Sequence, residues 1–261
     1  MDRLFIRESQ GALASQMGSP IDKLNIAVTG LGQNVGTTFV ASSLAFYFAE
    51  KEKNLTFTQC LTPSCSGGLL YDAAAMDQRF CNRAFADVYR LIKEGKSLKE
   101  TRNIECGVNW RIPTPWDCEN KVDLDVVERA RLIQSARGRI CIYDMEMGDS
   151  WDKYLLDMDM ILVVVDPLPS KLIRSSSRFK QLKQMEMAGA KMRWLVNRIN
   201  GGVSRRQVSG YLKSKDLIYI EEFPIESIYG DEYFCRFHWQ NQEIKCKLMD
   251  VFTKVSHEMD V

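Results

Sequence analysis

Histidine is scarce in this chain, and its cysteines show no pairing pattern. The two histidines, His238 and His257, do not stand beside a cysteine at ligand spacing, and none of the eight cysteines forms a CxxC pair. Because zinc sites combine cysteine and histidine at short, regular spacings, we expect no structural zinc. A chain of 261 residues does not need disulfide bonds to fold, so we expect free thiols.

Long apolar runs are missing as well. No stretch approaches the ~18 consecutive apolar residues of a membrane span. The opening residues 1–8 carry acidic side chains without the apolar core of a secretory signal. These absences predict a cytoplasmic protein. The net charge of +1 argues against wholesale binding of a polyanion, although it leaves a local basic surface open.

Strand-length and helix-length segments alternate along most of the chain. This order is typical of a doubly wound α/β fold, in which a mostly parallel sheet carries helices on both faces. The expected strands cover 24–29, 55–59, 108–112, 139–144, 160–165, 192–197 and 217–221, and the expected helices cover 38–51, 124–136, 171–188 and 204–213. The apolar residues in 1–22 follow neither the spacing of a helix nor that of a strand. We therefore expect an N-terminal arm at 1–22 and a single domain at 23–261.

A glycine-containing loop, residues 30–38, follows the first expected strand and precedes the first expected helix. Such a loop binds phosphate through a nest of backbone N–H groups and the positive end of the helix. Working loops add a lysine on the β- and γ-phosphates and a Ser or Thr hydroxyl on Mg²⁺. Here Thr37 stands at the lysine position and Thr38 at the magnesium position. A tight strand-to-helix turn that binds nothing is the structural alternative.

Residues 26–29 and 35–45 resemble the MinD/ParA family of P-loop NTPases, whose motif KGGVGKTT precedes an apolar helix. In that alignment Gly32 occupies the position of the signature lysine, which reaches across a dimer, and Gln33 and Asn34 replace two glycines. Both family lysines are therefore absent. The pilus-localisation branch, TadZ or CpaE, resembles the chain more closely, because its members often replace the loop lysine with a small residue.

The resemblance continues in three later segments. Asp144 and Gly148 match the family's Asp-x-x-x-Gly, which implies that Asp144 supports Mg²⁺ through water and that Gly148 contacts the γ-phosphate. Asn197 and Arg198 match a Val-Asn-Arg segment in which Asn reads the adenine edge, and residues 222–225 resemble a segment beside the base. A capping role for Asp144 and a turn role for Asn197 are the structural alternatives. The implied contacts are, for phosphate, Gly30, Gly32, Gln33, Asn34, Val35, Gly36, Thr37, Thr38, Phe39 and Gly148; for adenine, Asn197, Arg198, Phe223 and Pro224; and for magnesium, Thr38 and Asp144.

The end of the second expected strand departs from the family. Residues 58–63 contain no carboxylate where family members place an Asp that orients the attacking water. Losing this Asp together with the lysine should slow phosphoryl transfer by orders of magnitude. We therefore expect a catalytically weakened protein that binds ATP or ADP with Mg²⁺ and acts as a homodimeric localisation or scaffolding factor for a partner assembly. The alternative is a slow ATPase in which Lys171 or an arginine replaces the missing lysine.

Two further patterns leave alternatives open. A basic series between residues 171 and 215 lies in the half of the chain where ParA-type proteins contact DNA, although such charges more often form a solvated helix face. The last expected helix lines one face with Ile244, Leu248, Phe252, Val255 and Met259. That stripe favours packing on the sheet or on a second subunit over membrane attachment.

Overall fold

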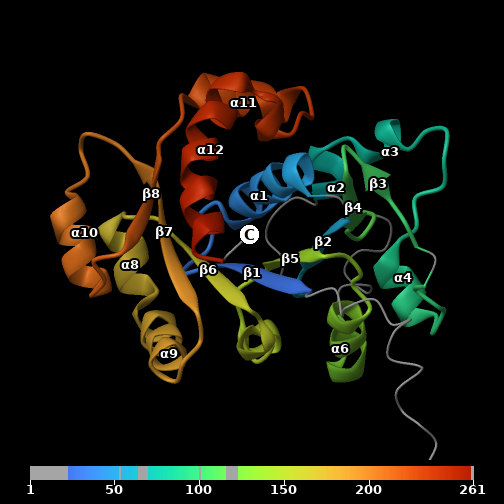
Figure 1. Ribbon diagram of the computed structural model, residues 1–261, viewed down its shortest axis with the longest axis horizontal. Coiled ribbons are helices and arrows are strands. Elements are labelled where there is room, and N and C mark those ends of the chain that lie inside the picture. The colour runs from blue at the N-terminus through green and yellow to red at the C-terminus, as the bar shows by residue number, and fades with distance from the viewer. Residues whose placement is uncertain (1–22, 53, 64–69, 100, 116–122, 260–261) are drawn as a thin grey trace, which may run out of the picture.

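A twisted, mostly parallel sheet forms the centre of the molecule (Figure 1). The computed structural model describes residues 23–52, 54–63, 70–99, 101–115 and 123–259, so the expected N-terminal arm lies outside the described residues. Within these ranges the sheet has eight strands in the order β3-β4-β2-β5-β1-β6-β7-β8. The strands are β1 (Leu24–Gly30), β2 (Leu55–Cys60), β3 (Ile104–Glu105), β4 (Val108–Arg111), β5 (Ile140–Met145), β6 (Met160–Val165), β7 (Met192–Ile199) and β8 (Leu217–Glu221). All neighbours are parallel except β3 and β4.

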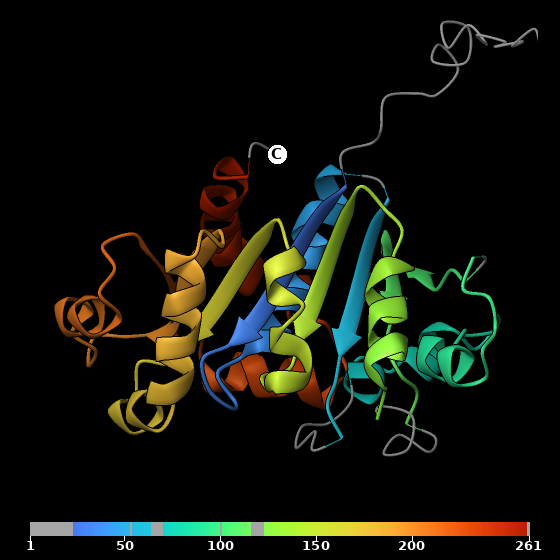
Figure 2. The same ribbon diagram turned by 90° about the horizontal axis from the view of Figure 1, so that it is seen from below.

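Helices cover both faces of the sheet, as the alternating pattern predicted (Figures 1 and 2). They are α1 (Thr37–Lys51), α2 (Leu70–Ala73), α3 (Met76–Arg79), α4 (Val88–Lys93), α6 (Val126–Gln134), α7 (Asp149–Asp152), α8 (Pro169–Arg174), α9 (Ser176–Met187), α10 (Arg205–Leu212), α11 (Ile225–Tyr233) and α12 (Gln242–His257), with short 3₁₀ turns at Leu155–Asp157 and His238–Gln240. Figure 2 shows α6 and α9 lying across one face of the strands, and Figure 1 shows α1 and α12 on the other.

The sheet separates two hydrophobic cores. One joins alternate side chains of the strands to α1 and α12, and the other joins the opposite side chains to α4, α6 and α9. Strand β6 is buried along its whole length, because it lies between β1 and β7 with helices on both faces. This arrangement brings the carboxyl ends of the parallel strands together at one edge, where ligands bind in folds of this class.

The apolar stripe of the last helix faces the protein interior. In α12, Ile244, Leu248, Phe252 and Val255 are fully buried, and they belong to the same core as α1. Packing against the core accounts for the helical spacing of these apolar residues, so no membrane or partner surface is needed to explain it. None of the helices in the described part of the chain is long and apolar enough to cross a bilayer.

One expected helix is in fact two. The segment predicted as a helix at 171–188 divides into α8 and α9 at Ser175, whose φ of −94° and ψ of 13° interrupt the helical path. The amide of Ser175 donates to the carbonyl oxygens of Lys171 and Leu172 at 3.0 and 3.2 Å, which tightens the last turn of α8. The break matters for the site described next, because it places Ser175 against the glycine loop.

Candidate functional site

The glycine loop connects β1 to α1 at the carboxyl edge of the sheet. Gly36 is the N-cap of α1 and has a φ of 92°, a conformation that favours glycine. A Cβ atom added at Gly36 would lie 2.5 Å from Nδ2 of Asn197 on β7. This position therefore requires glycine both for its backbone angle and for the close approach of a neighbouring side chain.

Gly32 stands where the resemblance places the dimer-crossing lysine. A Cβ atom added there would lie 2.7 Å from Oγ of Ser175, so any side chain at this position requires Ser175 to move. The short break between α8 and α9 creates this contact. The loop is thus fitted to a small residue at position 32, which agrees with the absence of the lysine.

A cavity of about 220 Å³ opens beside the loop. Its lining contains every phosphate-contact residue predicted between positions 30 and 39, together with residues from the ends of β2 and β5; the full set is Gly30, Gly32, Gln33, Asn34, Val35, Gly36, Thr37, Thr38, Phe39, Gln59, Leu61, Asp144, Glu146 and Met147. Gly148 directly follows this lining as the N-cap of α7. The fold therefore brings the loop and the Asp144 segment together around one space.

The hydroxyl of Thr38 donates a 2.7 Å hydrogen bond to Oδ2 of Asp144. These are the two residues predicted to serve magnesium. Burial raises the pKa of the Asp144 carboxyl to about 7, the Thr38 hydrogen bond opposes the rise, and the charge of Glu146 adds to it. Glu146 itself accepts hydrogen bonds from the backbone and the hydroxyl of Thr62, at 2.6 and 2.7 Å.

The charge of the cavity is unusual for a phosphate site. Asp144 and Glu146 contribute two carboxyl groups to its lining, whereas none of the described lining residues is a lysine or an arginine. Gln59 lies within the segment 58–63, where the resemblance implies a water-orienting Asp; it is 2% exposed, and its Oε1 has no hydrogen-bond partner among the described residues. The end of β2 therefore brings a buried amide oxygen, and no carboxylate, to the lining of the cavity.

Two cations lie beside the loop without lining this cavity. Lys171 Nζ and Arg198 Nη1 approach the carbonyl oxygen of Asn34 at 3.2 and 3.1 Å. Both also contact Oδ2 of Asp166, at 2.8 and 2.7 Å. Burial tends to raise the pKa of Asp166, but hydrogen bonds from Lys171, the amide of Leu168 and Arg198 hold it below its ordinary value. Lys171 thus braces the loop through a carbonyl group.

Arg178 fixes the start of the loop from the opposite side. Its side chain is 7% exposed and donates to the carbonyl oxygen of Gly30 at 2.8 Å and to Oγ1 of Thr29 at 2.9 Å. Its third partner is Asp152, whose Oδ2 lies 2.5 Å from Nη1. Arg178 belongs to the basic series, and its burial removes it from any basic surface.

A second cavity, of about 520 Å³, adjoins the first through Gly36 and Phe39. Three of the predicted adenine contacts, Asn197, Arg198 and Phe223, line it. Pro224, the fourth, precedes α11 as its N-cap. The remaining lining residues are Glu221, Glu222, Ile225, Ile228, Glu232 and His238.

Aromatic side chains form one wall of this second cavity. The ring of Phe39 lies 5.8 Å from that of Phe223 and 5.1 Å from that of His238, measured between centroids. The amide of Asn197 already has two partners, since Nδ2 donates to the Val35 carbonyl at 2.9 Å and Oδ1 accepts from the Arg198 amide at 3.0 Å. Asn197 therefore holds the loop in place at the boundary of the cavity.

Sequence reasoning missed several lining residues. Glu146, Met147 and His238 were not among the predicted contacts. Gln59 could have been found from its position, because it lies in the segment 58–63, where the resemblance implies a water-orienting Asp. For His238 no sequence signal existed, since it reaches the cavity from the 3₁₀ turn after α11, far from the recognised segments.

No protein-family model matches the chain, and no curated protein matches its sequence. Solved structures do match its fold. A ParA family ATPase from Chlorobium tepidum superposes with a TM-score of 0.70 at 12% identity, covering 88% of this chain and 97% of that one. The MinC:MinD cell division complex of Aquifex aeolicus gives 0.66 at 16% identity, covering 90% and 96%.

A third match is the septum site-determining protein MinD of Pyrococcus horikoshii, a complex with Mg-ADP. It gives a TM-score of 0.66 at 16% identity and covers 91% of this chain and 96% of that one. These likenesses span nearly all of each chain. The chain therefore has the fold of the ParA and MinD ATPases.

Proposed function

We propose that this chain is a catalytically weakened nucleotide-binding protein that acts as a homodimeric localisation or scaffolding factor. The observation that carries the proposal is the lining of the loop cavity, which has two carboxyl groups and no described cation. Phosphoryl transfer depends on positive charge placed against the developing negative charge. A cavity with the opposite balance supports holding a nucleotide with a metal ion more than cleaving it.

Magnesium fits the residues that are present. Mg²⁺ prefers oxygen ligands and keeps several of its waters, and the hydroxyl of Thr38 and the carboxyl of Asp144 are oxygen donors 2.7 Å apart in the cavity. Bound Mg²⁺ supplies positive charge against phosphate oxygens. Thr38 would hold the ion and Asp144 would support it, while the loop amides would receive the phosphates. The second cavity, with Phe39 and Phe223, is proposed for the adenine ring.

A slow ATPase is the second candidate, and the preserved pair of Thr38 and Asp144 favours it. Its proposed cation, Lys171, would have to leave Asp166 and the carbonyl oxygen of Asn34 and turn into the cavity. Both contacts are short and one is an ion pair, so this movement carries a cost. We therefore place the weakened protein ahead of the slow enzyme.

Adding back the missing charge tests the proposal. In Thr37→Lys the new ammonium group would stand at the family's phosphate position, whereas Thr37→Met supplies similar length without charge. Calorimetric titration with Mg-ATP and Mg-ADP should show at least roughly tenfold tighter binding for Thr37→Lys than for either Thr37→Met or the unchanged chain, the value expected for one charge-assisted contact. Equal affinities would refute the electrostatic argument.

A phosphate-release assay on the same proteins separates the two candidates. The unchanged chain should show turnover far below the ~1 s⁻¹ lower bound of ordinary enzymes. Turnover near that bound, abolished by Lys171→Met and retained by the neighbouring exposed Arg174→Met, would favour the slow ATPase. Lys171 contacts the loop and Asp166, whereas Arg174 is exposed on the same helix, so the control removes a nearby cation that does not contact the loop.

The pilus-localisation branch and the homodimer belong to the same proposal. The branch is supported by the loop, since Gly32 and Thr37 replace lysines and a side chain at position 32 would require Ser175 to move. Pairing of two copies would then proceed without a crossing lysine. Light scattering with and without Mg-ATP tests this: a dimer in the presence of nucleotide is expected, and a monomer under both conditions would contradict it.

A further inference from the structure

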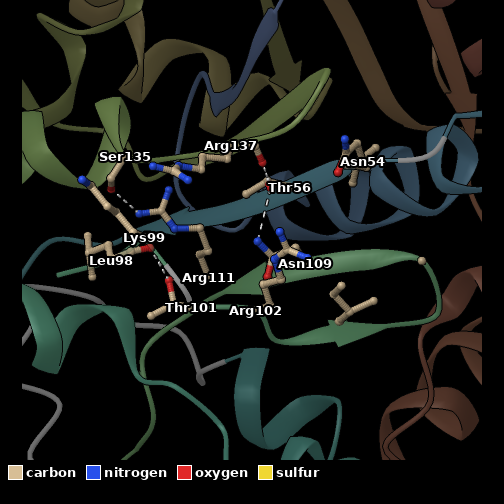
Figure 3. Close-up of a pocket in the computed structure, with 13 residues that line it drawn as sticks. Asn54, Thr56, Leu98, Lys99, Thr101, Arg102, Asn109, Arg111, Ser135 and Arg137 are labelled. Carbon is tan, nitrogen blue, oxygen red and sulfur yellow. Dashed lines mark hydrogen bonds between the residues drawn. The ribbon is translucent and has the colours of Figure 1, made fainter.

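A separate cavity lies at the amino-terminal end of β2, away from the carboxyl ends of the strands where the glycine loop lies. Figure 3 shows the residues that line it. It is formed where β2 begins, whereas the loop follows the end of β1. Its volume is about 130 Å³, and its walls come from β2, β4, the segment before β3 and the segment after α6. It therefore shares no residue with the two cavities of the nucleotide site.

Positive charge gathers around this cavity. Lys99, Arg102, Arg111 and Arg137 line it, and none of its described lining residues is acidic. Figure 3 shows the side chains of Arg111 and Arg137 reaching from β4 and from the segment after α6 toward the side where Ser135 lies. This balance is the reverse of that in the loop cavity, which has two carboxyl groups and no described cation.

Arg111 is the central observation. It ends β4, is only 3% exposed, and uses Nη2 to donate a 2.7 Å hydrogen bond to Oγ of Ser135. Its Nη1 is buried and has no hydrogen-bond partner among the described residues, and no described carboxylate forms an ion pair with the guanidinium group. Burial lowers the pKa of Arg111. A buried charge without a partner is costly, so proteins seldom keep one without compensation.

The neighbouring polar groups do not supply that compensation. The hydroxyl of Ser135 donates to the Arg131 carbonyl at 2.5 Å, and the hydroxyl of Thr101 donates to the Leu98 carbonyl at 2.9 Å. Both hydroxyl hydrogens are thus engaged within the protein. The described lining of the cavity thus carries four cationic side chains and no carboxylate to balance them.

We propose that this cavity binds a small phosphate-type oxyanion, either inorganic phosphate or the terminal phosphate of a small molecule. Arg111 forms the buried base of the site, and Lys99, Arg102 and Arg137 form its exposed rim. A phosphate group matches forked guanidinium donors and carries enough charge for several cations. The backbone of a DNA duplex does not enter a cavity of this size, so it cannot reach Nη1 of Arg111.

Binding of inorganic phosphate to the full chain tests the proposal. Equilibrium dialysis at constant ionic strength should give one phosphate per chain whose affinity falls at least roughly tenfold in Arg111→Met, because one or two charge-assisted hydrogen bonds are lost. Arg139→Gln is the matched control, since Arg139 is an exposed arginine that pairs with Glu52 and does not line the cavity. It should bind phosphate as the unchanged chain does.

Thermal unfolding gives an independent readout. Replacing a buried, unpaired charge by an apolar side chain should leave the melting temperature in chloride unchanged or raise it. Phosphate should then stabilise the unchanged chain and Arg139→Gln more than it stabilises Arg111→Met, which retains only the general salting effect. Equal stabilisation of all three proteins would overturn the proposal.

A second variant keeps the test decisive if Arg111→Met does not fold. The double change Lys99→Gln and Arg137→Gln alters exposed side chains only, and it should weaken phosphate binding several-fold. Parallel titrations with glycerol 3-phosphate and inorganic phosphate distinguish the two sources of the anion, and tighter binding of either supports the site. Binding of a single-stranded oligonucleotide that survives Arg111→Met, with no binding of phosphate or glycerol 3-phosphate, would overturn it.

Discussion

The raised pKa of Asp144 leads to a prediction about stability and pH. Asp144→Asn keeps the shape of the side chain and an oxygen that accepts from Thr38, but it removes the titrating group. In the unfolded chain this carboxyl ionises near 3.8, and in the folded chain near 7. Between pH 3.8 and 7 the folded protein keeps a proton on Asp144 that the unfolded chain has lost. The free energy of unfolding therefore falls as the pH rises through this range, and the loss caused by Asp144 is constant above pH 7.

The size of the effect follows from the same two values. They are about three pH units apart, and each unit corresponds to ~1.4 kcal/mol, so the ionised carboxyl costs up to ~4 kcal/mol of unfolding free energy at pH 8. Asp144→Asn carries no such penalty. Its free energy of unfolding relative to the unchanged chain should therefore rise steadily from pH 5 to pH 7 and then level off.

Urea unfolding at pH 5, 6, 7 and 8, without nucleotide or Mg²⁺, measures this difference. Asp166→Asn is the matched control, because the pKa of Asp166 is lowered and its carboxyl stays ionised over this whole range. It should lower stability by about 2 kcal/mol or more at every pH, with no change in slope. A difference for Asp144→Asn that does not vary with pH would refute the reasoning from burial.

Three further predictions concern the loop and the core, each measured by urea unfolding. Gly36→Ala should lower the free energy of unfolding by about 1–3 kcal/mol, because its φ is positive and the new methyl group meets Asn197. Calorimetry should also show weaker nucleotide binding, and unchanged binding would contradict the described loop. Arg178→Met should lower the free energy of unfolding by about 3–5 kcal/mol, because it leaves the carboxylate of Asp152 buried without its ion pair. A loss below about 1 kcal/mol would show that solvent reaches this pair. Phe252→Ala should cost about 3–5 kcal/mol, as expected for a fully buried ring, whereas a small effect would mean that α12 packs loosely.

Much of the fold could be predicted from the sequence, because local patterns and burial agree. Strands Met160–Val165 and Leu217–Glu221 match the expected bounds, since each is an apolar run with a clear turn at its end. The expected helix at 171–188 was wrong in one respect, because it divides at Ser175 into α8 and α9. Between residues 64 and 118 the sequence predicted only the strand at 108–112, whereas the described residues there also form short helices and the antiparallel strand β3.

The glycine loop itself could be located, but its surroundings could not. Contacts between Asn34 and both Lys171 and Arg198 join residues more than 130 positions apart, and no local pattern encodes them. The same is true of Arg111, which reads as an ordinary strand end in the sequence. Its burial without an ion-pair partner among the described residues emerges only when β2, β4 and the end of α6 are brought together.

The contacts of the loop with β7 and α8 have a consequence for signalling. Asn197 holds the Val35 carbonyl, and Lys171 and Arg198 hold the neighbouring carbonyl of Asn34, so protein side chains maintain the shape of the loop. A ligand entering such a loop has little ordering entropy to overcome. It also has little structural change to induce there. A partner that distinguishes the empty protein from the occupied one must therefore detect the ligand itself, or a change outside this loop.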